Sequence, residues 1–172
     1  MLEHCTLCPR QCGVNRNAGE HGFCGADARI RIGLASLHQW EEPCLSGTNG
    51  AGTVFFCHCP LGCVYCQNHD ISGLDADASG ICTDISGLAD TFLSLQQRGA
   101  HNIDLVTPTQ YVAQLTQAIP LARRRGLTIP IVYNCGGYER VETLRMLDGL
   151  IDIYLPDLKY YSSYYSERYS RA

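Results

Sequence analysis

The sequence predicts an α/β fold in which short strands alternate with helices. From Thr53 onward, apolar runs of four or five residues alternate with longer segments of helical periodicity. A polar segment follows each apolar run, whereas the first 50 residues are rich in cysteine and glycine instead. Strands that alternate with helices in this way favour a parallel sheet or a barrel.

The N-terminal part, residues 1–50, is predicted to be a cysteine-rich extension. Its segment before the first strand has little hydrophobic periodicity, so it cannot bury much apolar surface and would need a metal ion to hold its shape. A strand is predicted over 30–37 and a loop over 41–52. Four cysteines stand close together in this part: Cys5, Cys8, Cys12 and Cys24.

Residues 51–172 form the second predicted unit. Asp84 is a suitable N-cap for a helix that ends at Gly99, with an apolar stripe between them. Further helices are predicted over about 110–125, where Pro120 is expected to kink or split the helix, and over 141–149. The four predicted strands are the apolar runs 53–56, 103–106, 129–133 and 151–155.

Polar or metal-binding residues follow all four predicted strands. Because the carboxyl ends of parallel strands meet at one edge of a sheet, we expect these segments to lie on the same face. Enzymes with barrels or doubly wound sheets build their active sites there. The four segments are 57–66, 107–109, 134–137 and 157–159.

Three cysteines after the first of these strands are candidate metal ligands. Cys59, Cys63 and Cys66 have the spacing C-x3-C-x2-C. Three thiolates are one fewer than a closed zinc site or a fully cysteine-ligated iron–sulfur cluster requires. A metal centre on them would therefore keep one position open to a small molecule. The alternative is a structural zinc site that Cys57 completes as the fourth ligand.

Charge and cysteine usage exclude several classes of protein. The net charge of -4 and the pI of about 5.8 argue against nucleic acid or a membrane surface as a partner. No apolar run approaches the roughly 20 residues that span a bilayer. The eleven cysteines are odd in number and follow no signal peptide. We therefore expect a cytoplasmic protein whose grouped cysteines bind metal in a reducing compartment.

With these residues the chain resembles the radical S-adenosylmethionine (SAM) superfamily, and within it the branch similar to pyruvate formate-lyase activating enzymes. The resemblance covers nearly the whole chain. It implies a (β/α) barrel of six strand–helix units, of which about four are present here, so the chain is expected to be truncated at its C-terminus. The motifs that carry it include Cys5-Thr6-Leu7-Cys8-Pro9-Arg10, Gly52-Thr53-Val54-Phe55-Phe56, Cys63-Val64-Tyr65-Cys66-Gln67-Asn68 and Tyr154-Leu155-Pro156-Asp157-Leu158-Lys159.

The resemblance implies an iron–sulfur enzyme. Cys59, Cys63 and Cys66 would hold a [4Fe–4S] cluster whose open iron binds SAM. One electron from the reduced cluster would cleave SAM to methionine and a 5′-deoxyadenosyl radical, which removes a hydrogen atom from a substrate. The implied partners are an electron donor such as flavodoxin or ferredoxin and a protein that receives a glycyl radical.

The same resemblance assigns SAM contacts to residues outside the cluster. Tyr65 would lie near the adenine and Asn134 near the ribose. Asp157 and Lys159 match an Asp-x-Lys element that contacts SAM, and Lys159 would pair with its carboxylate.

The sequence departs from the family pattern after the second predicted strand. Many relatives have a Gly-Gly-Glu element there that receives the SAM amino group. Thr107 and Thr109 occupy that place here, and their hydroxyl groups could accept the hydrogen bond.

The four N-terminal cysteines suit either a structural zinc ion or a second iron–sulfur cluster. Two other functions stay open at this point. The chain could be a zinc-stabilised binding module without catalysis, or an inactive fragment that binds a cluster but does not bind SAM.

Overall fold

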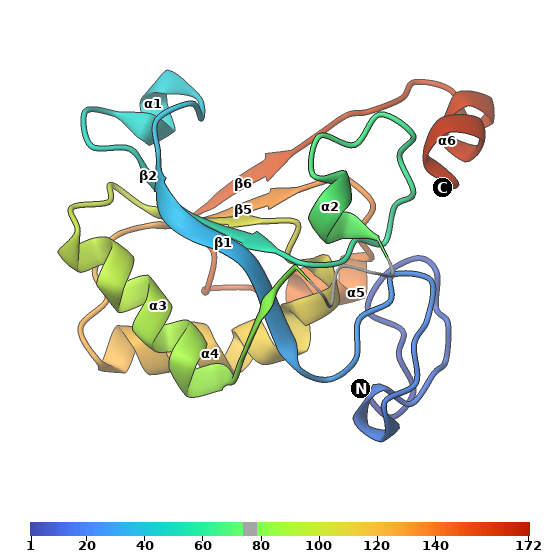
Figure 1. The fold of residues 1–172 in the computed structure, drawn as a ribbon, viewed down its shortest axis with the longest axis horizontal. Coiled ribbons are helices and arrows are strands. Elements are labelled where there is room, and N and C mark those ends of the chain that lie inside the picture. Colours follow the sequence, from blue (N-terminus) through green and yellow to red (C-terminus); the bar gives the residue numbers. More distant parts are fainter. Residues whose placement is uncertain (74–78) are drawn as a thin grey trace.

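The computed structural model describes residues 1–73 and 79–172 and contains one mixed β-sheet (Figure 1). The strand order is β3-β1-β2-β4-β5-β6. Strands β2, β4, β5 and β6 run parallel, whereas β1 pairs antiparallel with both β2 and β3. The α/β prediction is thus confirmed. The strands are β1 (Ile30–His38), β2 (Ala51–Phe56), β3 (Ile81–Thr83), β4 (Ile103–Val106), β5 (Ile131–Cys135) and β6 (Ile153–Pro156).

The first two predicted helices form close to their expected positions. The helix predicted over 141–149 is shorter and ends at Arg145, and the loop predicted over 41–52 contains a short helix at Pro43–Ser46 and the start of β2. The Asp84 carboxylate accepts a hydrogen bond of 2.8 Å from the Gly87 amide and caps α3, while Gly99 adopts φ +91° just after that helix ends. Pro120 lies inside α4 without splitting it, and the residues on both sides of it, Ile119 and Ala122, are fully buried in the core. The helices are α1 (Pro43–Ser46), α2 (His69–Ser72), α3 (Ile85–Gln97), α4 (Val112–Arg124), α5 (Val141–Arg145), α6 (Ser163–Ser170) and the 3-10 turns Arg16–Ala18 and Thr109–Tyr111.

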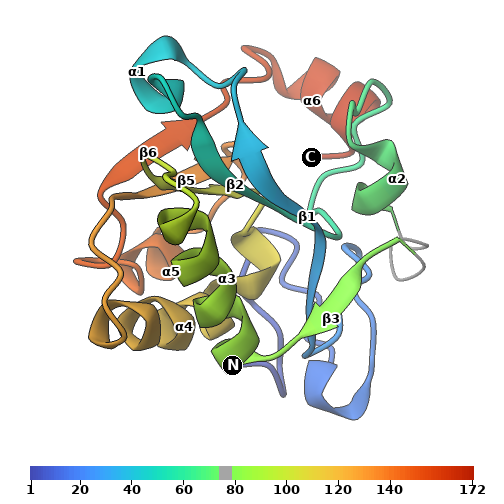
Figure 2. The same cartoon turned by 60° about the vertical axis from the view of Figure 1, so that its left-hand side comes forward.

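The hydrophobic core lies between the sheet and the pair α3 and α4. Figure 2 shows both helices on one side of the sheet, while α2 and α6 lie together at the far end. Val54 and Leu105 point from the strands into this core, where they meet Phe92 and Leu115, all with no exposed surface. Because side chains alternate along a strand, the residues between them point to the opposite face of the sheet, where the candidate site lies.

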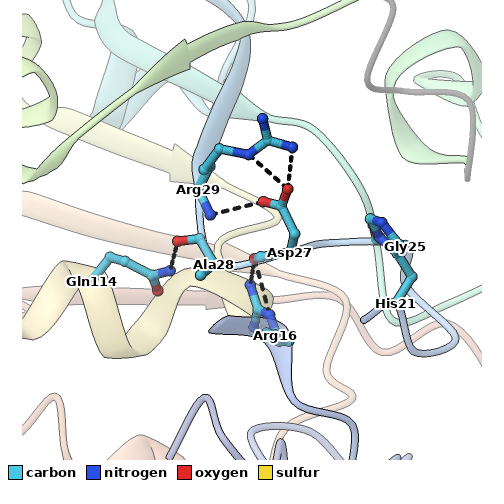
Figure 3. A network of polar contacts seen from close by, with 7 residues as sticks. All are labelled: Arg16, His21, Gly25, Asp27, Ala28, Arg29 and Gln114. Atoms are coloured by element: carbon cyan, nitrogen blue, oxygen red, sulfur yellow. Dashed lines mark hydrogen bonds and ion pairs between the residues drawn. The ribbon is translucent and has the colours of Figure 1, made fainter. Parts of the chain in front are cut away.

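The N-terminal segment has little regular structure and is held by buried polar contacts. The Arg16 guanidinium, 2% exposed, donates two hydrogen bonds to the Asp27 carbonyl and one of 2.6 Å to the Gln110 carbonyl. Figure 3 shows the bonds from Arg16 to Asp27 and a neighbouring contact, in which the Gln114 side chain donates to the Ala28 carbonyl. The segment is therefore fastened to α4 and the turn before it.

The proposed boundary near residue 50 falls between two paired strands. β1 belongs to the N-terminal part, and its residues from Ile32 to His38 pair with β2. The division into residues 1–50 and 51–172 stays an expectation from the sequence. No helix in the described ranges is both long enough and apolar enough to cross a membrane.

Candidate functional site

A cavity of about 610 Å³ opens where the four parallel strands end. Its walls come from the loops after β2, β4, β5 and β6 and from the segment after β1. The structure brings together around this one cavity every residue that the sequence assigns to the main cluster or to SAM: Cys59, Cys63, Tyr65, Cys66, Thr107, Thr109, Asn134, Asp157 and Lys159.

Each thiol of the cysteine loop has a hydrogen-bonding neighbour. The Leu61 amide donates to Cys59 Sγ at 3.4 Å, and the Ser170 hydroxyl donates to Cys63 Sγ at 2.8 Å. Cys66 Sγ lies 3.5 Å from the Ser72 hydroxyl. Burial raises the pKa of the Cys59 thiol to about 12, so this thiol is protonated at neutral pH.

The three thiols face a common space without converging on a point. Within residues 1–73 and 79–172, no three His, Cys, Asp or Glu side chains are arranged to hold a single metal ion. A zinc ion needs its ligands around one point, whereas the thiolates of a cubane cluster bind different iron atoms and stand further apart. Cys57 is buried outside the cavity lining, where a Cβ atom on Gly80 would lie 2.4 Å from its Sγ. In this conformation, therefore, Cys57 does not complete a zinc site with the three cavity thiols.

Two residues with left-handed backbone conformation stand at adjacent strand ends. His58, directly before Cys59, has φ +70°, and Thr107, directly after β4, has φ +56°. Residues other than glycine adopt this conformation at a cost, and such residues cluster at functional sites.

The Gln110 side chain holds both turns in place. Its amide nitrogen lies 2.9 Å from each of three carbonyl oxygens, those of Cys57, His58 and Thr107. Gln110 is only 3% exposed. Gln110 was not predicted as a site residue, because no local sequence pattern indicates that one side-chain amide will bind two separate loops.

Asp157 and Lys159 form an ion pair at the edge of the cavity. Lys159 Nζ lies 2.5 Å from Asp157 Oδ2. Although partial burial lowers it, the hydrogen bond and charge of Asp157 raise the pKa of Lys159 above its usual value, so the amine is charged. Its charge also acts on Cys59, which places this cation next to the cysteine loop. The backbone at Gly136 packs closely against the Leu61 side chain. A Cβ atom at Gly136 would lie 2.8 Å from Leu61, so only glycine fits there without a shift.

Glu139 lines the same cavity and was not predicted from the sequence. The Thr109 hydroxyl donates a hydrogen bond of 2.7 Å to Glu139 Oε1. Burial raises the pKa of the Glu139 carboxyl, while the hydrogen bond from Thr109 opposes the shift. The segment after β4, Thr107-Pro108-Thr109, has no carboxylate of its own. Because Thr109 binds it, the Glu139 carboxylate lies beside this segment. Glu139 lies beyond the residues that directly follow β5, so its position relative to the strand end does not predict it.

A chain of hydroxyl groups connects Tyr65 to the cysteine loop. The Tyr65 hydroxyl donates to Tyr160 at 2.6 Å, the Tyr160 and Ser170 hydroxyls lie 2.7 Å apart, and Ser170 donates to Cys63. Tyr65 is 53% exposed, so its ring is accessible from the cavity mouth. The aromatic residues after β6 thus contact the loop that carries the candidate ligands.

The N-terminal cysteines form a second group of thiols. Burial, with smaller contributions from nearby Cys24, Cys12 and Cys5, raises the pKa of Cys8 to about 11, which indicates that the four lie close together. Backbone amides are the main donors to these thiols. The Phe23 amide lies 3.4 Å from Cys12 Sγ. Amides of Arg10 and Ala26 donate to Cys8 and Cys24, which are partly buried, whereas Cys12 is exposed.

Side chains join the two cysteine groups. Arg10 Nε donates to the Pro60 carbonyl at 3.1 Å, inside the loop that begins at Cys59. The Arg10 guanidinium also stacks on the Phe23 ring at 3.7 Å. A Cβ atom at Gly62 would lie 3.5 Å from the Phe23 ring, so this ring also packs against the loop.

Comparison with known proteins identifies one relative with significant similarity and no functional assignment. The chain matches no protein-family model. It is 31% identical, over 179 aligned positions, to an uncharacterized protein of Methanocaldococcus jannaschii. The alignment takes in 99% of this chain and 50% of that protein. The chain therefore spans about half the length of the curated relative it matches.

Proposed function

We propose that this chain is a radical SAM iron–sulfur protein that cleaves S-adenosylmethionine reductively. One observation carries the proposal. Residues from four separate loops, chosen from the sequence alone, line a single cavity of about 610 Å³ at the carboxyl ends of parallel strands. The order of these strands suits the first part of a (β/α) radical SAM barrel.

The donor set in the cavity fits a [4Fe–4S] cluster with one open iron. Cys59, Cys63 and Cys66 would hold it, and the hydrogen bonds from Leu61 and Ser170 would stabilise the negative charge on the ligating sulfurs. When bound and reduced, such a cluster supplies the electron that cleaves the carbon–sulfur bond of SAM to give methionine and a 5′-deoxyadenosyl radical. The implied electron donor is a flavodoxin or ferredoxin.

The remaining cavity residues would bind and orient SAM. Lys159 presents a cation to the methionine carboxylate, and Asp157 holds that cation in position. Glu139, held by Thr109, supplies a carboxylate for the amino group, the role that a Gly-Gly-Glu element has in relatives. Asn134 would contact the ribose from its position at the end of β5.

Other residues would complete the SAM site and exclude water. Tyr65 would cover the adenine at the cavity mouth. The Thr107 turn, fixed by Gln110, forms part of the wall between the β4 and β5 loops. A dry, preformed cavity would protect a carbon radical from side reactions with solvent.

We propose that the N-terminal thiols hold a second metal, either zinc or an iron–sulfur cluster, for which they would have to move together from the positions described above. All four are reduced and lie near one another. Backbone N–H groups directed at sulfur suit metal-bound thiolates of either kind. The proposed reaction partner is a protein that receives a glycyl radical, as the family resemblance implies.

The test is purification and cluster reconstitution without oxygen. We expect a brown protein that contains iron and sulfide and that forms 5′-deoxyadenosine when dithionite and SAM are added. A colourless protein with zinc alone would contradict the proposal and support the zinc-stabilised binding module. Calorimetric titration with SAM separates the remaining alternative, because an inactive cluster-binding fragment would carry iron and sulfide without binding SAM.

A further inference from the structure

A buried carboxyl group lies beneath the floor of the cavity. Asp104, in β4, has no exposed surface and points to the same side of the sheet as Val106, which lines the cavity. Thr53 is its register partner on β2 and is equally buried. Across the residues that the structure describes, neither oxygen of Asp104 nor the Thr53 hydroxyl has a hydrogen-bond partner. Buried polar groups seldom remain unpaired, so we expect a ligand to form hydrogen bonds with these three oxygen atoms.

A second carboxyl group faces Asp104 from the cavity side. Glu41 lines the cavity, and its side chain is only 14% exposed. Burial and the proximity of Glu41 raise the pKa of Asp104 to about 7. Thr53 and Asn134 also face Asp104 closely enough to influence it, although neither reaches hydrogen-bonding geometry. A proton shared by the two carboxyl groups would satisfy only one oxygen of each and leave the Thr53 hydroxyl unpaired.

No lysine or arginine of the described cavity lining pairs with Glu41 or Asp104. Among its described lining residues, Lys159 is the one lysine or arginine, and it is engaged by Asp157. His38 approaches Glu41 only to 4.0 Å, between His38 Nε2 and Glu41 Oε1. Glu139 adds a further carboxyl group to the same lining. The cavity therefore carries an excess of negative groups and favours a positively charged guest.

We propose that Glu41 and Asp104 form a binding site for an organic cation, the ammonium or guanidinium group of a second reactant. Its N–H groups would satisfy the unpaired oxygens, with charge-assisted hydrogen bonds to the two carboxylates. An ammonium or guanidinium group carries several N–H donors, so one such group could bind both carboxylates and the Thr53 hydroxyl at once. That the guest is a reactant rests on the proposed function; that the pair binds a cation does not.

The experiment is calorimetric titration of the anaerobically purified chain with butylammonium and methylguanidinium chloride, using butanol as a neutral control. We expect saturable binding of at least one cation and none of butanol. Glu41→Gln should weaken that binding by about tenfold or more, because it removes one charge-assisted hydrogen bond. Asp104→Asn should act in the same direction. Glu42→Gln, a change of the adjacent exposed carboxylate outside the cavity lining, should leave binding unchanged.

Three outcomes would overturn the inference. They are an absence of saturable cation binding, equal binding of butanol, and equal binding by the Glu41→Gln variant. The same titration is then repeated in saturating SAM. Loss of cation binding under that condition would mean that SAM itself occupies the Glu41–Asp104 site and that no second reactant binds there. Because the first titrations need neither cluster nor SAM, failure of the proposed SAM cleavage would not affect them.

Discussion

The two groups of cysteines differ in what surrounds their sulfur atoms. The N-terminal thiols receive hydrogen bonds from amides of their own short segment, such as Phe23 to Cys12. The thiols of the Cys59–Cys66 loop are also approached by hydroxyl groups from α2 and α6, and they face a large cavity. A metal enclosed by four local ligands is typical of a structural site, whereas one beside a cavity is typical of a reactive site.

The largest expected effect separates the two groups by activity. Cys63→Ser should reduce cluster content and 5′-deoxyadenosine formation to background, because the main cluster loses one of three ligands. Cys12→Ser should retain the main cluster and measurable product. Iron and sulfide analysis together with product chromatography checks both variants. Equal loss in the two variants would show that the groups do not have separate roles.

The free energy of unfolding should depend more on the N-terminal cysteines than on the cysteines of the Cys59–Cys66 loop. Cys24→Ser removes one of the four N-terminal ligands from a segment that has little other structure, and we expect a loss of more than about 4 kcal/mol in free energy of unfolding. Urea denaturation measures it. Cys44→Ser, a change of an exposed cysteine outside both groups, is the matched control and should have little effect. An unchanged midpoint for Cys24→Ser would argue against a metal at this group.

A third variant tests whether the cavity loops depend on one side chain. Gln110→Leu removes the donor to three carbonyl groups and should cost about 3 kcal/mol of stability. Gln114→Leu removes a single hydrogen bond, to Ala28, and should cost only about 1 kcal/mol. Thermal unfolding of both variants gives the comparison. Similar losses would mean that Gln110 has no special role in holding the turns.

Much of this arrangement could be predicted from local sequence. The cap at Asp84, the stop at Gly99 and the four parallel strands each have a signal within a few residues. Because the carboxyl ends of parallel strands share one edge of the sheet, the sequence also predicts that the four loops after these strands lie together.

The features that sequence reasoning missed depend on distant partners. β3 is three residues long, with Ile81 75% exposed, and becomes a strand only because β1 offers an edge. Gln110 and Glu139 acquire their roles from residues on other loops. The burial of Asp104 follows from the register of β2 with β4, which the sequence does not reveal.

The smallest expected effect concerns the tuning of the reactive centre. Ser170→Ala removes the hydroxyl that donates to Cys63 Sγ and should shift the cluster's reduction potential to more negative values, since hydrogen bonds to sulfur stabilise the reduced state. A redox titration followed by electron paramagnetic resonance measures the shift. Ser163→Ala, at the exposed start of α6, is the control. A potential equal to that of the unchanged protein would show that this hydrogen bond does not tune the centre.

The buried Arg16 has a consequence for the order in which the chain folds. Its guanidinium binds a carbonyl 94 residues further along, and Thr143 donates a hydrogen bond to the Leu7 carbonyl across 136 residues. Contacts across such separations carry a high loop-closure cost and tend to form late. We therefore expect the N-terminal cysteines to be among the last parts of this chain to reach their final positions. Pulse-labelling hydrogen exchange during refolding would reveal this delay at the Arg16 amide.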